Sequence, residues 1–317
     1  MSADRPISRR DALKIGVGAG AALTLGKTNA FAELPWYQAG GLIERAIPSS
    51  GEKLPVIGIG TAVIYQNPTP DQLPPLRDTL KRFPELGGRI IDTAPGYGRA
   101  EVVVGDLLAE LGNRTKYFVA TKVSVRGGAD KAAAVAQMEE SFKRFKTDKI
   151  DLMQIWNVSN PTLLAPVLEE WKAAKKIRYT GITSSMKGAY GELEAAMKAY
   201  KYDFVQIDLA IDNRSAQERI IPLAKDLGMG VLVNSPFGRN RVFTKTQGKP
   251  LPDFAKEIDA TTWAQFALKY IVGNTAVTAA IPGIGRVDYL EDDMKAAHGR
   301  LPDEALRARM AAYLDAL

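Results

Sequence analysis

Three side chains that can exchange protons stand near the ends of two apolar segments. Asp92 follows the isoleucines of "RIIDTAPGYGRAE" (residues 89–101), Tyr97 lies between two glycines of that segment, and Lys122 stands near the end of "YFVATKV". A tyrosine hydroxyl ordinarily ionises at about pH 10, and a lysine ammonium beside it stabilises the phenolate. We therefore expect Tyr97 to be a general acid tuned by Lys122, with Asp92 as the counter-ion of the lysine.

Eight short apolar runs, rich in β-branched residues, alternate with segments of helical period. The runs cover 56–60, 89–94, 117–123, 150–158, 177–184, 204–210, 230–238 and 277–283. The helical segments cover 70–83, 100–111, 130–145, 163–174, 190–200, 215–227, 261–272 and 287–297. Strands that are apolar on both faces, each followed by a helix, indicate parallel βαβ units. The sequence therefore predicts an α/β fold, a (β/α)8 TIM barrel, with a doubly wound sheet as the alternative.

A barrel gathers its functional side chains at the carboxyl ends of its strands. Asp92, Tyr97 and Lys122 would then meet at one mouth. Each of them alone is more commonly structural, as an ion pair or a loop residue. Their joint occurrence at neighbouring strand ends favours catalysis, because groups that perturb one another's ionisation cluster at functional sites.

Two further segments have a predicted place in the barrel. Residues 42–56, "LIERAIPSSGEKLPV", alternate on both sides of a turn at 49–51, which predicts a hairpin at the bottom of the barrel. Residues 236–260 form the longest irregular stretch. Loops of this length are usually functional, and this one is expected on the catalytic face.

The first residues have the composition of an export signal. "SRRDALK" at 8–14 is followed by a small-residue apolar stretch at 15–26 and by Ala-Phe-Ala at 30–32. This order predicts a twin-arginine signal peptide over 1–32, followed by a single barrel domain over 33–317. We expect transport by the twin-arginine machinery to the periplasm, without stable membrane anchoring after cleavage.

Composition narrows the kinds of site. The 317 residues include no cysteine, which excludes disulfides and thiolate sites, and one histidine, which disfavours histidine-rich metal sites and Ser-His-Asp hydrolysis. We predict no metal, and a surface position for His298 in the polar stretch "KAAHGR". The 42 basic residues exceed the 36 acidic ones without forming a basic run, so a nucleic-acid partner is not expected.

Together these motifs resemble the aldo-keto reductase superfamily. The similarity is carried by "DTAPGYGRAEVVVGDLL", "ATKV", "GITSS", "VQIDLA", "NSPFG" and "IPG". The resemblance implies hydride transfer between a nicotinamide dinucleotide, usually NADP(H) with NAD possible, and a small-molecule aldehyde or ketone. It also implies Asp92, Tyr97 and Lys122 as catalytic residues, together with Trp156 in the fourth catalytic position, where it is either a donor to the carbonyl or a hydrophobic lid over the cofactor. The cofactor-binding residues implied are Thr61, Asn157, Thr183, Ser184, Gln206, Asn234, Ser235, Pro236, Phe237, Gly238, Gly283, Arg286, Asp292 and Asp293.

The sequence departs from that family at three places. Trp156 stands where the family has the histidine of its catalytic group, and the indole retains one N–H donor but no acceptor. Asn234 stands where the family has an aromatic residue that stacks on the nicotinamide, and Asp292 and Asp293 replace a Glu-Asn pair. An alternative function is therefore a cofactor-binding redox sensor or binding protein with weak or no catalysis. An isomerase or lyase using Lys122 is disfavoured, since a Schiff-base lysine does not need Tyr97.

Overall fold

The computed structural model describes residues 41–125, 127 and 130–317. The predicted signal peptide lies outside these residues. Eight parallel strands pair in chain order: β3 (Ile59–Gly60), β4 (Ile90–Asp92), β5 (Phe118–Val123), β6 (Ile150–Ile155), β7 (Ile177–Ser184), β8 (Phe204–Asp208), β9 (Gly230–Asn234) and β10 (Ala279–Ala280). Parallel bridges from Ile57 to Ala280 and from Gly60 to Gly283 join the two edge strands. The sheet is therefore closed, and the predicted (β/α)8 barrel is confirmed.

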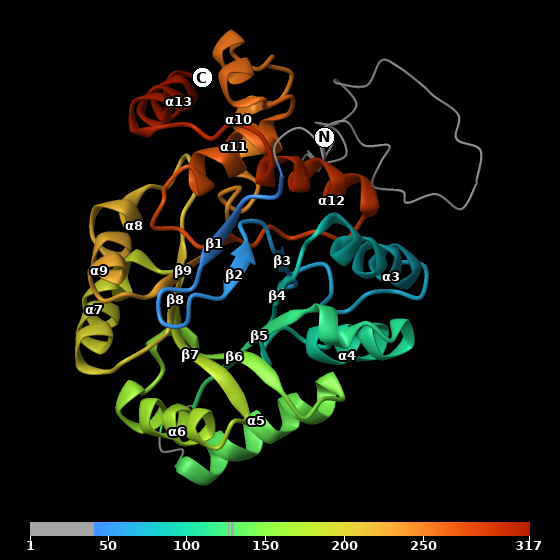
Figure 1. Ribbon diagram of the computed structural model, residues 1–317, viewed down its shortest axis with the longest axis vertical. Helices are drawn as coiled ribbons and strands as arrows, with labels where there is room; N and C mark the ends of the chain where they lie inside the picture. Colours follow the sequence, from blue (N-terminus) through green and yellow to red (C-terminus); the bar gives the residue numbers. More distant parts are fainter. Residues whose placement is uncertain (1–40, 126, 128–129) are drawn as a thin grey trace, which may run out of the picture.

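Helices surround the strands (Figure 1). They are α3 (Leu73–Arg82), α4 (Ala100–Leu111), α5 (Lys131–Phe145), α6 (Pro161–Ala173), α7 (Tyr190–Ala199), α8 (Ser215–Glu218), α9 (Ile220–Asp226), α10 (Arg241–Thr246), α11 (Trp263–Val272), α12 (Val287–Met294) and α13 (Glu304–Ala316). Several begin at a residue whose side chain accepts a hydrogen bond from a free backbone N–H of the first turn. Asp130 caps α5, Thr262 caps α11 and Asp303 caps α13 in this way.

The helices differ from the sequence prediction at three places. The segment predicted as one helix over 215–227 is divided at Arg219, whose backbone has φ −141° and ψ −57°. The stretch 236–260, expected to be irregular, contains α10 and the 3-10 helix η5 (Asp253–Ile258). The terminal helix α13 was not predicted.

The barrel interior is filled by side chains from the strands and from a hairpin of β1 (Glu44–Ala46) and β2 (Lys53–Pro55), which pair antiparallel. Ile47 and Leu54, next to and within this hairpin, share a fully buried cluster with Phe118, Phe204 and other strand residues. Burying each such side chain stabilises the fold by about 1.5–3 kcal/mol. The hairpin therefore closes the bottom of the barrel, as expected.

His298 is buried, with 3% of its surface exposed, so the predicted surface position is wrong. The segment follows the 3-10 helix η6 (Lys295–Ala297), and the backbone carbonyl of His298 accepts a 2.6 Å hydrogen bond from the buried Lys269 ammonium. A buried cation needs such acceptors, and this contact draws the polar stretch inward. Burial also lowers the pKa of His298.

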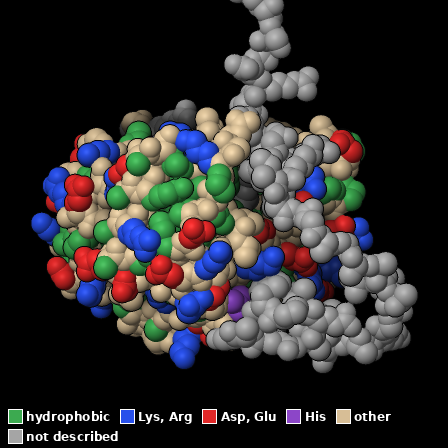
Figure 2. Space-filling view, turned by 90° about the horizontal axis from the view of Figure 1, so that it is seen from above, with side chains coloured by type: hydrophobic (Ala, Val, Ile, Leu, Met, Phe, Trp, Pro, Cys, Tyr) green, Lys and Arg blue, Asp and Glu red, His purple; other side chains and the backbone are tan. Residues whose placement is uncertain are grey.

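Acidic and basic side chains are intermingled over the face drawn in Figure 2. No helix within 41–125, 127 and 130–317 is both long enough and apolar enough to cross a bilayer. The same residues contain no group of three or more histidine, aspartate or glutamate side chains placed to hold a metal ion.

Candidate active site

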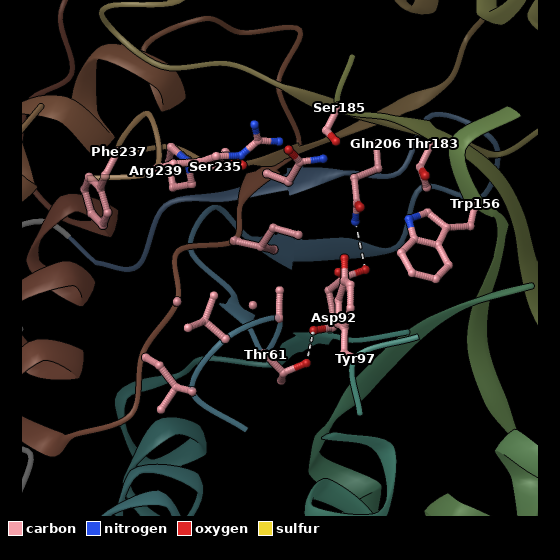
Figure 3. Close-up of a pocket in the computed structure, with 18 of the residues that line it drawn as sticks. Thr61, Asp92, Tyr97, Trp156, Thr183, Ser185, Gln206, Ser235, Phe237 and Arg239 are labelled. Atoms are coloured by element: carbon pink, nitrogen blue, oxygen red, sulfur yellow. Dashed lines mark hydrogen bonds between the residues drawn. The ribbon is translucent and has the colours of Figure 1, made fainter. Parts of the chain in front are cut away.

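A cavity of about 630 Å³ opens at the carboxyl ends of the strands. Most of the predicted site residues line it (Figure 3): Thr61, Asp92, Tyr97, Trp156, Asn157, Thr183, Gln206, Asn234, Ser235, Pro236, Phe237 and Gly283. The lining residues that the sequence analysis did not include among the binding residues are Gly60, Ala62, Val63, Ile64, Ser185, Arg239, Asn240 and Ile281. Most of these lie one or two residues from a predicted position, on loops whose course a strand pattern does not specify.

Asp92 and Lys122 form an ion pair beneath the cavity. The two residues end or nearly end the neighbouring strands β4 and β5, and Lys122 Nζ donates to Asp92 Oδ2 at 2.7 Å and to the Thr93 carbonyl at 2.8 Å. Lys122 is 1% exposed and Asp92 3%. Burial alone would lower the pKa of Lys122, but the Asp92 carboxylate and the Tyr97 phenol together raise the pKa above its usual value. Lys122 is therefore expected to be protonated, and Asp92 and the Thr93 carbonyl hold its ammonium group in place.

Tyr97 lies over this cation, with its ring centroid 5.2 Å from Lys122 Nζ. The tyrosine is half-buried and faces the cavity, whereas the lysine is enclosed. A phenol placed between a buried ammonium and an open cavity can release its proton to a ligand while the cation stabilises the phenolate. The predicted grouping of Asp92, Lys122 and Tyr97 is thus present in the structure.

The second carboxylate oxygen of Asp92 accepts hydrogen bonds from two side-chain amides. Gln206 Nε2 donates to Asp92 Oδ1 at 2.8 Å and Gln154 Nε2 at 3.1 Å. Sequence reasoning missed Gln154, which stands within the apolar run of β6. A signal was present, because a lone amide in a strand buried on both faces needs a polar partner, and Gln154 shares a face with Trp156 two residues on.

Trp156 packs against Tyr97 with the ring centroids 5.5 Å apart and the planes at 85°. Gly96 gives it room, since a Cβ there would lie 2.3 Å from the tryptophan ring. Asn157 and Val158, directly after it, adopt left-handed backbone conformations with φ 51° and 54°. This conformation is strained for a β-branched valine, and such strain is typical of functional sites.

The loop after β9 has an unusual run of left-handed residues. The φ angles are 50° at Ser235, 58° at Gly238, 53° at Arg239 and 79° at Asn240. Positive φ angles are uncommon outside glycine, so Ser235, Arg239 and Asn240 are held in uncommon conformations at the cavity. Among the described residues, the buried Asn234 Oδ1 has no hydrogen-bond partner, and Arg239 has no ion pair.

Five predicted site residues do not line the cavity, in addition to Lys122 beneath it. Ser184 is fully buried while Ser185 lines the cavity, because successive strand residues face opposite sides. Gly238 packs against Asp212, whose carboxylate would lie 2.5 Å from a Cβ there.

The other three belong to α12 and its start. Arg286 pairs with Asp288 through two 2.9 Å hydrogen bonds. Asp292 accepts from Thr262 Oγ1 and Gln265 Nε2, and Asp293 is fully buried.

The structure is thus a closed parallel barrel in which a buried lysine–carboxylate pair lies beneath a tyrosine at the carboxyl ends of the strands, an arrangement suited to proton transfer. The chain belongs to the aldo/keto reductase family of oxidoreductases, whose family model matches residues 56–313. The resemblance recognised in the sequence is confirmed.

Individual relatives are distant. Aldo-keto reductase YhdN of Bacillus subtilis is 30% identical over 165 residues, which cover 47% of this chain and 48% of YhdN, so this match spans about half of that relative. Norsolorinic acid reductase B of Aspergillus parasiticus is 25% identical over 74% of this chain and 73% of its own length. The crystal structure of an aldo-keto reductase from Klebsiella pneumoniae in complex with NADPH has a TM-score of 0.71 and 20% identity, with 86% of this chain and 95% of that one covered. At this identity the likeness concerns the fold.

Proposed function

We propose that the protein is an NADP(H)-dependent reductase of aldehydes or ketones, with Tyr97 as its general acid. The observation that carries this proposal is the 2.7 Å ion pair of Lys122 and Asp92, enclosed beneath a tyrosine that faces the cavity. The nicotinamide, when bound, supplies the hydride to the carbonyl carbon.

In this proposal, residues of the chain itself carry out the proton transfer. Tyr97 donates its hydroxyl proton to the carbonyl oxygen as negative charge develops there, and the Lys122 ammonium stabilises the phenolate that remains. Asp92 holds Lys122 in place and balances its charge, so that the cation is retained in a buried position. Low exposure strengthens these interactions, because water does not screen them.

The residues around the cavity fit a dinucleotide. The volume of the cavity, about 630 Å³, is in the range of small-molecule sites. Asn234 Oδ1, which has no hydrogen-bond partner among the described residues, offers an acceptor, and Arg239 in the loop of 235–240 offers its guanidinium to a diphosphate. The NADPH complex of the Klebsiella pneumoniae relative supports the choice of NADP(H).

NADH is the alternative cofactor. Arg286, the cation expected near the adenosine, is engaged by Asp288, and Asp292 and Asp293 add negative charge to the same helix. A 2′-phosphate must compete with Asp288 for this arginine, whereas a 2′-hydroxyl need not.

Trp156 acts in this proposal as a wall of the substrate site. Its indole N–H makes no hydrogen bond within the described residues, and its ring is held by Tyr97 and the Gly96 backbone. The loss of one positioned donor typically costs about 100-fold to 1000-fold in rate. This is why a redox sensor that binds the cofactor tightly with weak catalysis is a second candidate.

The substrate proposed is an apolar or ring-bearing carbonyl compound. Trp156 and Phe237 line the cavity, and the exposed aliphatic side chains of Val63 and Ile64 stand at it. Trp36, a further aromatic candidate for this mouth, lies outside the described residues. Preference for small charged aldehydes in a substrate panel would contradict this assignment.

Export to the periplasm by the twin-arginine route also remains a proposal, since residues 8–14 lie outside the described residues. That route carries folded proteins, so the cofactor would be loaded before transport. Cell fractionation tests it: the unchanged chain should be periplasmic and processed, and the Arg9→Lys, Arg10→Lys double variant should stay unprocessed in the cytoplasm. Equal distribution of both would refute the signal.

The enzymatic proposal is tested by titrating the protein with NADPH and NADH while following fluorescence, and then adding a carbonyl panel. We expect NADPH binding and cofactor oxidation that Tyr97→Phe abolishes without weakening NADPH binding. Tight binding with no turnover on any carbonyl favours the sensor. Absence of binding to either dinucleotide refutes both.

A further inference from the structure

Two side-chain amides share one carboxylate oxygen, Asp92 Oδ1. Gln206 comes from β8 and Gln154 from β6, and both donate through Nε2 to the same oxygen. The other oxygen is taken by Lys122. The carboxylate thus has three donors, and two of them serve one atom.

The two amides differ in what can reach them. Gln206 lines the cavity, on the side where Figure 3 draws Thr183 and Trp156, so a ligand can contact its side chain. Gln154 is 0% exposed and is absent from the cavity wall. The Gln206 amide can therefore be drawn from Asp92 to a ligand, whereas Gln154 is out of reach of a ligand in the cavity.

The neighbouring strand β7 leaves room for the Gln154 side chain. Gly181 is its register partner on β7, and a Cβ at that glycine would lie 2.9 Å from Gln154 Cγ. A side chain at 181 would clash with the aliphatic part of Gln154, so the glycine leaves the space that Gln154 occupies.

If Gln154 only filled space in the core, it would lower the stability of the fold. Its Oε1 is buried and has no hydrogen-bond partner among the described residues. An unsatisfied buried acceptor destabilises a fold, and an apolar side chain of equal length would avoid that cost. The amide also has one usable orientation, because the opposite one would set Oε1 against a carboxylate oxygen.

We propose that Gln154 is a positioning residue for Asp92. It keeps Asp92 Oδ1 hydrogen-bonded when Gln206 turns from that oxygen to a ligand in the cavity, so the ion pair with Lys122 keeps its geometry under Tyr97. The identity of that ligand as a nicotinamide dinucleotide rests on the proposed function, but the sharing of one acceptor by two amides does not.

The first experiment needs no cofactor. Urea unfolding midpoints are measured for the unchanged protein, Gln154→Met, Gln206→Met and the double variant. Each single variant leaves one amide on Asp92 Oδ1, and the double variant leaves none. We expect the double variant to lose more stability than the sum of the two single losses.

Gln217→Met is the matched control, since this glutamine bonds Tyr270 and Arg307 away from the cavity. Combined with Gln206→Met it should give additive losses. If the stability losses of Gln154→Met and Gln206→Met are also additive, the proposed shared-acceptor role is overturned.

The second experiment follows NADPH binding and turnover. In Gln154→Met, a ligand that draws Gln206 from Asp92 leaves Oδ1 without an amide donor, so we expect Kd for NADPH to rise about tenfold, close to the lower limit for one hydrogen bond to a charged group. The value of kcat for Gln154→Met should fall, while its KM for the carbonyl should not change. In the control Gln217→Met, Kd for NADPH and kcat should both equal those of the unchanged protein.

The outcomes separate the two proposals. Unchanged Kd and kcat in Gln154→Met, in a protein that binds and turns over NADPH, overturn the positioning role. No NADPH binding by the unchanged protein is a failure of the proposed function, and the unfolding cycle still decides whether the two amides share Asp92.

Discussion

Gly96 offers a direct test of how Trp156 is held. An alanine Cβ at this position would lie 2.3 Å from Cζ3 and 2.4 Å from Cη2 of Trp156, where ordinary contacts begin at 3.4 Å. The ring must therefore retreat by about 1 Å, and because it is half-buried at the cavity it can move without unfolding the barrel. Overpacking of this kind costs about 1–3 kcal/mol, and we expect the lower end of that range.

Catalysis should suffer more than stability. Tyr97 packs on the same tryptophan, so displacing the ring disturbs the proton donor, and misplacement by about 1 Å can cost about 100-fold in rate. The assay is urea unfolding together with kcat for Gly96→Ala. Gly191→Ala is the control, since nothing lies within 4 Å of a Cβ there.

Removal of the tryptophan ring should rescue the Gly96→Ala variant. In a Trp156→Ala background the clash is absent, so Gly96→Ala should cost almost no stability. If Gly96→Ala costs as much there as in the unchanged protein, contact with Trp156 is not why the position is a glycine.

Three other predictions concern charged groups. Lys122→Met leaves Asp92 as an unpaired buried carboxylate, so it should destabilise the fold by about 3–5 kcal/mol and remove turnover, as urea unfolding and kcat will measure. Burial lowers the pKa of Lys269 to about 8, below its unfolded value of 10.5, so the unfolded state binds the proton more tightly between these values. Stability from this group should rise from pH 8 to pH 10.5, and thermal unfolding of Lys269→Met should lack that rise. Burial opposes ionisation of Glu52, but hydrogen bonds from Tyr179 and a neighbouring arginine hold the pKa of Glu52 below its usual 4.5. Its contribution is therefore complete above pH 4.5 and lost as pH falls through the folded value, so acid unfolding of Glu52→Gln should be less steep.

Local patterns were sufficient for most of the elements. Each expected strand contains an observed one, and α4 has the predicted bounds. The helices follow from a period of 3.6 residues and the strands from short apolar runs rich in β-branched residues, and both are local features of the chain. The prediction for His298 failed because a tertiary contact overrides the local pattern: Lys269 draws it inward. The helix over 215–227 is broken at Arg219 for a local reason, since Pro222 has no N–H to donate to the carbonyl of Glu218.

The sequence by itself determined the barrel, because eight βα repeats with strands apolar on both faces have few other ways to bury their surfaces. It also determined which strand ends carry Asp92, Tyr97 and Lys122. Only the tertiary structure decided which oxygen of Asp92 meets which donor. Gln154 and Gln206 are separated from Asp92 by 62 and 114 residues, and closure of the sheet brings them onto one oxygen. Such a contact depends on strand register and barrel closure, which no local pattern records.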